Sequence, residues 1–193
     1  MKAIPATSIL RQSRKVYILA AGAAAAVSVA IAPNTQGIAG AGLALLAATI
    51  AAIDARHFVI PDELNLGALM LALINTSIQY PDNIVEAIAL ALLRGFASAC
   101  TFLCLQISYR WLRNREGLGS GDVKLAGVAG AWLGWSTIPI AVEFAALAAL
   151  GTYAIHHCVN GSTLRATGRL PFGLFFAPAI WFGWLLETTS FSP

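Results

Sequence analysis

The chain has 193 residues, of which 58% are hydrophobic and only 11% are charged. A soluble globular domain is about 45–50% apolar and about a quarter charged. This composition, with a mean hydropathy of +0.74, therefore excludes an ordinary soluble domain and indicates an integral membrane protein. The net charge of +3 does not indicate a nucleic-acid-binding protein, because the basic residues are spread over short loops between apolar segments.

Apolar segments follow one another along the chain after a polar, basic segment at residues 1–15. The first apolar segment could also be a cleavable signal peptide, although the many segments behind it favour a membrane span. We predict one membrane-embedded domain over residues 1–193, an all-α bundle of about seven transmembrane helices. The expected spans are 16–32, 37–53, 63–78, 84–109, 122–135, 138–158 and 171–186.

The basic residues predict the orientation of these spans. With the N-terminus in the cytoplasm, cytoplasmic loops hold every basic residue except Arg94, and the positive-inside rule is satisfied. Asp54 and Asp122 then lie at one membrane depth, on the cytoplasmic side. The residues placed in the cytoplasm are Lys2, Arg11, Arg14, Lys15, Arg56, Arg110, Arg113, Arg115, Lys124, Arg165 and Arg169.

Two carboxylates at one membrane boundary can carry out chemistry. An ionised side chain next to hydrocarbon is costly, so each aspartate is a candidate functional residue. Two aspartates that approach closely share a proton, and such a pair can hydrolyse a peptide by general acid–base catalysis. The residue pattern alone supports peptide hydrolysis no more strongly than a simpler interpretation, in which both aspartates only cap helices. No metal or other cofactor is expected, because the three histidines form no H-E-x-x-H pattern and the three cysteines no C-x-x-C pair.

Three motifs occur in a characteristic order: IDARHFVIPD at residues 53–62, GSGDVKL at 119–125 and LPFG at 170–173. Together they resemble the signatures of the type IV prepilin peptidases, membrane aspartyl proteases of the G-x-G-D type, over roughly residues 40–188. The resemblance implies that Asp54 and Asp122 are the catalytic pair. It also implies that the other motif residues bind substrate or shape the site, namely Gly119, Gly121, Lys124, Pro61, Asp62, Pro171, Phe172 and Gly173.

The resemblance further implies a bacterial protein of the cytoplasmic membrane that cleaves the short basic leader from prepilin-like or pseudopilin-like substrates. Lipid is the other expected partner; nucleic acid is not, and no oligomeric state is indicated. No part of the chain matches the cytoplasmic domain with two C-x-x-C pairs that larger family members use for N-methylation, so the compact form is expected. Leu174 departs from the family pattern, which usually has proline there.

Several charged residues also have simpler interpretations. Asp62 follows Pro61 and is expected to cap the next helix. Lys124 is expected to be a membrane-surface anchor, and Arg94 to form an ion pair with Glu143 inside the bundle. The alternative function is a small transporter or proton-conducting protein that uses Asp54 and Asp122 as membrane carboxylates. Transporters often contain internal repeats, and we find no convincing repeat between the two halves.

Overall fold

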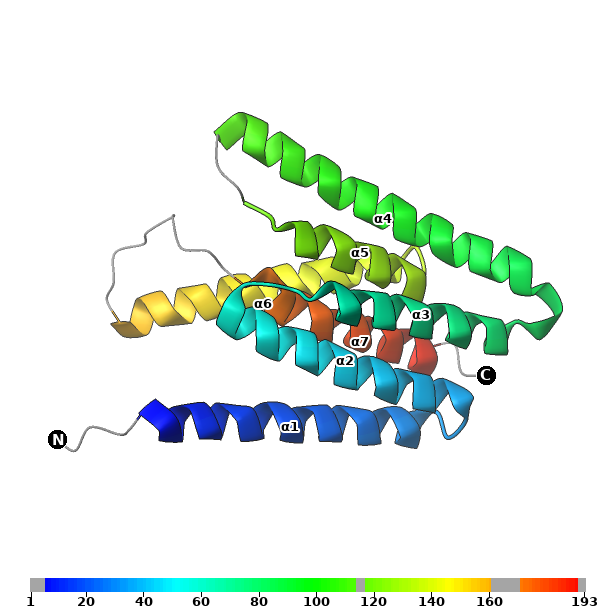
Figure 1. The fold of residues 1–193 in the computed structure, drawn as a ribbon, viewed down its shortest axis with the longest axis horizontal. Helices are drawn as coiled ribbons and strands as arrows, with labels where there is room; N and C mark the ends of the chain where they lie inside the picture. The colour runs from blue at the N-terminus through cyan, green and yellow to red at the C-terminus, as the bar shows by residue number, and fades with distance from the viewer. Residues whose placement is uncertain (1–5, 114–116, 161–170, 191–193) are drawn as a thin grey trace.

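The computed structural model describes residues 6–113, 117–160 and 171–190. Within these residues the chain is helical and contains no strand (Figure 1). The elements are α1 (Ala6–Ile31), α2 (Thr35–His57), α3 (Asp62–Gln79), a 3-10 turn η1 (Pro81–Asn83), α4 (Ile84–Arg113), α5 (Ser120–Trp132), α6 (Thr137–Asn160) and α7 (Phe172–Ser190).

The order of the helices confirms the all-α prediction, but several helix ends differ from those expected. Helix α1 begins at Ala6 and takes in most of the basic segment. Helix α2 continues through His57, so Asp54 lies inside its last turn rather than after it. Helix α5 ends at Trp132, before the expected end at residue 135. Residues 1–5, Arg115, Arg165 and Arg169 lie outside the described residues.

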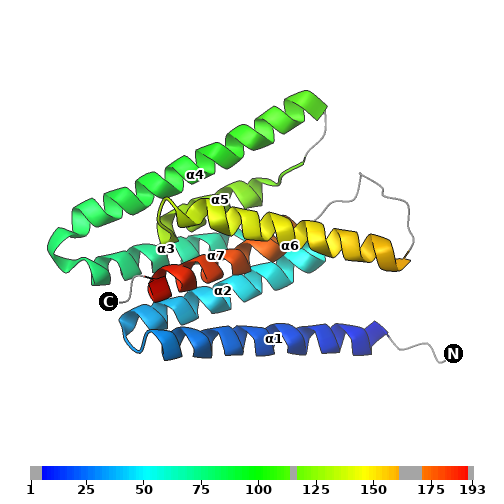
Figure 2. The same cartoon turned by 180° about the vertical axis from the view of Figure 1, so that it is seen from behind.

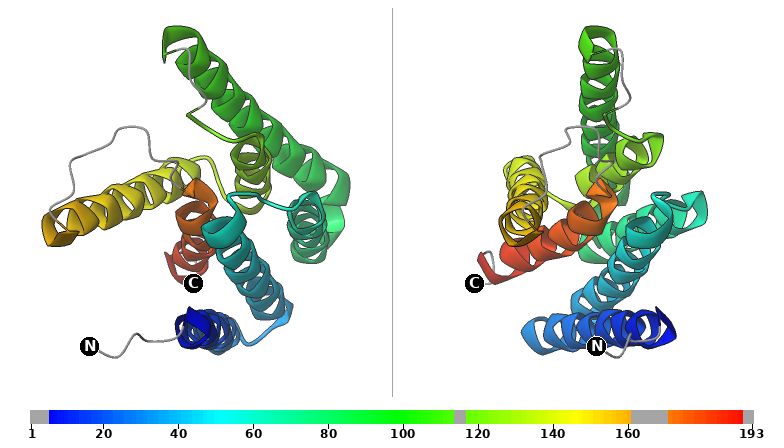
Figure 3. Two further views of the ribbon diagram at one scale, coloured as in Figure 1. Left: turned by 60° about the vertical axis from the view of Figure 1, so that its left-hand side comes forward. Right: turned by 90° about the vertical axis from the view of Figure 1, so that its left-hand side faces the viewer.

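Helices α2, α3, α5 and α7 form the centre of the molecule, and α1 and α4 lie on opposite sides of it (Figure 1). Figure 2 shows α6 from the other side, where it crosses in front of α7. The views in Figure 3 show α1, α4 and α6 diverging from the centre. In Figure 1 the end of α2 and the starts of α3, α5 and α7 lie together at the left.

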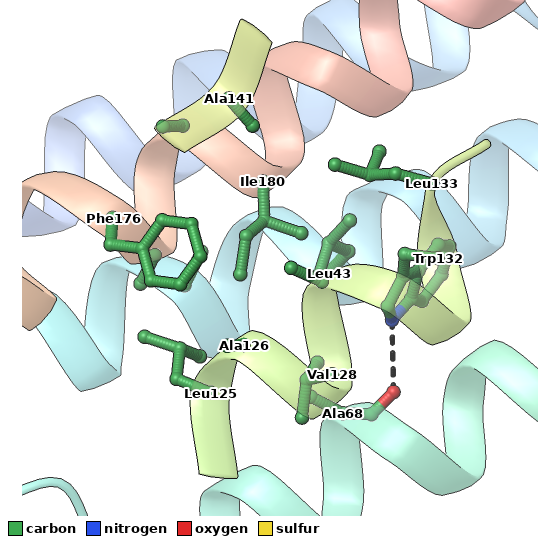
Figure 4. Packing of buried hydrophobic residues seen from close by; sticks show 14 of the residues in the cluster. Leu43, Ala68, Leu125, Ala126, Val128, Trp132, Leu133, Ala141, Phe176 and Ile180 are labelled. Atoms are coloured by element: carbon green, nitrogen blue, oxygen red, sulfur yellow. Dashed lines mark hydrogen bonds between the residues drawn. The ribbon is translucent and has the colours of Figure 1, made fainter. Parts of the chain in front are cut away.

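Half of the buried core cluster is alanine, and the other half is larger apolar side chains that fill the space between the helices. Figure 4 shows Leu125, Phe176 and Ile180 within this cluster. The buried Trp132 indole donates its Nε1–H to the Ala68 carbonyl oxygen at 2.9 Å and joins α5 to α3. Small residues allow the close helix packing that stabilises helical bundles in membranes.

Helices α4 and α5 approach each other most closely where glycines face the partner backbone. A Cβ atom on Gly95 would lie 2.8 Å from the Gly127 carbonyl oxygen. A Cβ atom on Gly130 would lie 2.6 Å from Ser98 Oγ. Both distances are shorter than real Cβ contacts, so no other residue fits these positions without movement. The glycines at 95, 127 and 130 therefore allow α4 and α5 to pack closely.

Three helical segments of the described chain are long and apolar enough to cross a membrane: Thr35–His57, Pro81–Arg113 and Phe172–Ser190. The central helix α5 has 13 residues, which correspond to a length of about 20 Å, less than the hydrocarbon thickness of about 30 Å. Its residues from Val128 to Trp132 are all buried. Helix α5 is thus enclosed by other helices and begins close to the end of α2.

The expected ion pair between Arg94 and Glu143 is wrong. The Arg94 Nε–H group donates to the Gly130 carbonyl oxygen at 3.2 Å, and Glu143 is exposed on α6. Arg94 instead lines a cavity of about 800 Å³, together with Glu86 and Glu187. Glu187 accepts a hydrogen bond from the Gly134 amide at 2.7 Å. The guanidinium group is therefore held by α5 backbone and faces polar groups, not a carboxylate on α6.

Candidate active site

Asp54 is held by two helices. It lies in the last turn of α2, and its side chain is only 5% exposed. The Leu174 backbone N–H at the start of α7 donates to Asp54 Oδ2 at 2.9 Å. The first amides of a helix have no partner within that helix, so a carboxylate is a favourable acceptor for them. The start of α7 thereby fixes the Asp54 side chain.

Asp122 is held by its own loop. It is the third residue of α5 and is 9% exposed. Its Oδ2 atom accepts the Gly119 backbone N–H at 3.0 Å, while its own backbone N–H donates to the Gly119 carbonyl oxygen at 3.2 Å. The bond from the Gly119 N–H to the carboxylate is the half of a capping box that the third helical residue makes. It fixes the carboxylate at the start of α5. The remaining carboxylate oxygen is free of these contacts.

A cavity of about 450 Å³ brings the two carboxylates together. They are close enough for their charges to interact, although 67 residues separate them along the chain. The rest of the cavity is lined by the segment between α2 and α3 and by the start of α5. The lining residues are Asp54, Phe58, Val59, Ile60, Pro61, Asp62, Glu63, Gly119, Ser120, Gly121, Asp122 and Lys124.

Ile60 sets the spacing of the helices around this cavity. Its buried side chain lies between Gly121 on α5 and Gly173 on α7. A Cβ atom on Gly121 would lie 3.0 Å from Ile60 Cβ. A Cβ atom on Gly173 would lie 2.7 Å from Ile60 Cδ1 and 2.9 Å from Asp54 Oδ2. Glycine at 173 therefore allows α7 to approach the Asp54 carboxylate.

Asp62 and Lys124 form an ion pair at the rim of the cavity. The Lys124 ammonium group lies 2.7 and 2.8 Å from the two Asp62 carboxylate oxygens, and the side chains are 52% and 68% exposed, respectively. The expected capping role of Asp62 is wrong, because the residue before α3 is Pro61 and no side chain caps that helix. The pair joins α3 to α5 beside the two buried aspartates.

The predicted site residues therefore fall into two groups. Asp54, Asp122, Gly119, Gly121, Lys124, Pro61 and Asp62 all line the cavity, and Gly173 touches Asp54. Pro171 and Phe172 lie outside the lining. Phe172 packs instead against Phe102 and Phe176, with ring centroids 6.4 and 5.2 Å apart.

Sequence reasoning missed two groups that hold the site. One is Ile60, which the sequence shows only as one residue of the first motif. The other is the Leu174 backbone N–H, which no side-chain pattern can indicate. A proline at this position, as the related motif usually has, carries no N–H and could not make the same hydrogen bond. This chain therefore holds Asp54 by a contact that depends on its departure from the motif.

The fold and the site define a class of protein: a helical membrane protein with two buried carboxylates facing one cavity at the end of its helices. Comparison with known proteins gives the family. The sequence profile of the type IV leader peptidase family matches residues 41–155, and the chain belongs to that family.

Three relatives show the extent of the similarity. The chain is 35% identical over 126 residues to the leader peptidase HopD of Escherichia coli, an alignment that covers 65% of this chain and 78% of HopD. It is 34% identical to HopD of Salmonella typhimurium, with coverage of 65% and 78%. It is 33% identical over 163 residues to a prepilin leader peptidase/N-methyltransferase of Burkholderia pseudomallei. That alignment covers 82% of this chain but half of the relative. No solved structure matches the chain.

Proposed function

We propose that this protein cleaves the leader from prepilin-like proteins at the cytoplasmic face of a bacterial inner membrane, with Asp54 and Asp122 as the catalytic pair. One observation carries the proposal: the two aspartates come from separate helices, are both buried and line the same cavity. Membership of the type IV leader peptidase family supports the reaction class. The relatives whose names include an N-methyltransferase are matched over 34–57% of their length, so the proposal is limited to peptidase activity.

Two close carboxylates cannot both ionise easily, so the pair shares one proton in its resting state. The ionised carboxylate takes a proton from a water molecule, whose oxygen attacks the scissile carbonyl carbon. The protonated carboxylate donates its proton to the carbonyl oxygen, which gives a tetrahedral diol. The C–N bond then breaks as the amine receives a proton from the first carboxylate, while the second regains its own from the diol. The products are a leader with a free carboxylate and a mature chain with a free amine.

The positions of the charges support a multi-pass topology with the site on the cytoplasmic side. Arg56 lies in the last turn of α2, and Arg110 and Arg113 lie in the last turn of α4. These helix ends lie at the same end of the molecule as the start of α5 (Figure 1). A short basic leader stays on the cytoplasmic side while the apolar segment that follows it lies in the membrane. A cavity at this end of the molecule can therefore receive the peptide bond between the leader and the apolar segment.

Hydrolysis can be tested with the purified protein. The protein in detergent is mixed with a full-length prepilin, and the products are analysed by mass spectrometry. We expect one cut between the basic leader and the apolar segment, unchanged by a metal chelator. Intact prepilin after prolonged incubation would contradict the proposal. The transporter alternative places its carboxylates along a route through the membrane, whereas the cavity that contains both aspartates lies at the ends of α2 and α5.

A further inference from the structure

A second groove continues from the active-site cavity along an exposed, apolar side of the molecule. It has a volume of about 390 Å³, lies between α3, α4 and α5, and shares Asp62 and Lys124 with the cavity of the two aspartates. Its α3 wall runs from Asp62 to Leu69, a distance of about 10 Å at 1.5 Å per residue. Apart from the shared ion pair and Asn65, its walls are apolar or glycine.

Asn65 is the unusual residue in this groove. It lies one turn after Asp62 and is only 5% exposed, yet neither its Nδ2 nor its Oδ1 atom has a hydrogen-bond partner. A buried amide without partners costs free energy, so a group that bonds it is expected from outside the chain. The amide offers N–H donors and a carbonyl acceptor side by side, which match the C=O and N–H of a peptide backbone.

We infer that this groove binds the first turns of the substrate's apolar segment, with Asn65 hydrogen-bonded to the substrate backbone next to the scissile bond. This inference rests on the proposed function. A peptide bond must leave its helix before it can be hydrolysed, and unwound backbone groups near the membrane need polar partners. Asn65 supplies such a partner. The apolar residues of the substrate then lie against Leu66, Leu69 and Phe96.

A lipid chain is the competing occupant, and the chemistry of Asn65 separates the two. An acyl chain forms no hydrogen bond, and an ester group accepts but does not donate. Of a peptide and an acyl chain with its ester group, only the peptide can both donate to and accept from the amide. The shared ion pair also makes the groove continuous with the catalytic cavity, so a bound segment can pass from one into the other without leaving the protein.

Photocrosslinking tests occupancy without relying on catalysis. A photoreactive phenylalanine analogue replaces Leu66 in the groove, in an Asp54→Asn background that keeps the substrate intact. The same analogue at Leu93, an exposed α4 residue outside the groove lining, is the matched control. We expect a crosslink from position 66, and not from 93, to the apolar segment of a full-length prepilin. Crosslinks from position 66 to lipid alone would overturn the inference.

Kinetics supply the second test. Asn65→Leu removes an unpartnered buried amide, so the thermal midpoint should stay level or rise. The KM for prepilin should rise about five-fold to ten-fold, with a smaller change in kcat. An unchanged KM would show that Asn65 does not bind substrate, and a large fall in the midpoint would show a structural role.

Filling the groove gives a third readout. Ala99→Trp places an indole within the groove, and Leu93→Trp places one outside it. We expect cleavage of prepilin to fall at least about ten-fold in the first variant and to persist in the second. Equal cleavage by wild type and Ala99→Trp would overturn the groove alone. Failure of the wild type to cleave prepilin would overturn the proposed function.

Discussion

Gly173→Ala should inactivate the enzyme without unfolding it. The added Cβ would lie 2.9 Å from Asp54 Oδ2 and 2.7 Å from Ile60 Cδ1, whereas ordinary contacts begin near 3.4 Å. The Ile60 methyl group is the end of a flexible side chain and can rotate away. The Asp54 carboxylate is fixed by the Leu174 amide and must move by about half an ångström, or break that hydrogen bond.

The expected loss of activity follows from this displacement. A misplacement of about 1 Å in a catalytic group costs on the order of a hundred-fold in rate. We therefore expect kcat for prepilin cleavage to fall by about ten-fold to a hundred-fold. The fold itself should survive, because the nearest atoms to the added methyl group belong to the Asp54 and Ile60 side chains and not to the backbone of another helix. Initial cleavage rates and thermal unfolding in detergent measure the two effects.

Gly67→Ala is the matched control. Gly67 lies within α3, and a Cβ atom there would meet nothing within 4 Å. This variant should keep its activity and gain up to about 1 kcal/mol of stability. If Gly173→Ala cleaved prepilin as fast as Gly67→Ala, the close approach of α7 to Asp54 would not matter for catalysis. That result would refute the geometric argument.

Three further variants test separate parts of the structure by thermal unfolding. Lys124→Met removes the exposed ion pair with Asp62 and should cost less than about 1 kcal/mol, so a large fall in the midpoint would contradict the rim assignment. Phe58 has a φ angle of 53° at the end of α2, so Phe58→Gly should relieve about 1 kcal/mol of backbone strain. A marked loss of stability in this variant would show that contacts of the exposed ring stabilise the fold more than the strain destabilises it. Trp132→Phe removes the indole hydrogen bond to the Ala68 carbonyl oxygen, which keeps its own helical N–H donor within α3, and should cost about 0.5–1.5 kcal/mol; an unchanged midpoint would contradict this.

The sequence was sufficient for the helices and for the two aspartates. Long apolar segments separated by polar loops identify helices, because the backbone within a membrane must satisfy its own hydrogen bonds. Asp54 and Asp122 could be predicted to meet because they occur in ordered motifs at the boundaries of such segments. The same motif predicted Gly119 and Gly121 at the site, and both line the cavity.

The sequence was not sufficient for contacts between helices that are distant in the chain. Asp62 looks like a helix cap because its neighbours fit that role, and the distance to Lys124 depends on how α3 packs against α5. The expected depth of Arg94 in the membrane is compatible with several hydrogen-bond partners. It bonds the Gly130 carbonyl oxygen because α4 and α5 approach each other closely there. The Leu174 amide that holds Asp54 is a backbone group, so the type of residue at this position does not predict the hydrogen bond.

The shared role of the two aspartates is the central claim, and single-turnover cleavage of a full-length prepilin by Asp54→Asn and Asp122→Asn tests it most directly. Asparagine keeps the shape of the side chain but can neither accept a proton from water nor supply one in the cycle. We expect each variant to bind prepilin, to unfold near the wild-type temperature and to release no detectable leader. Leader release by either variant at a rate close to that of the wild type would contradict the account.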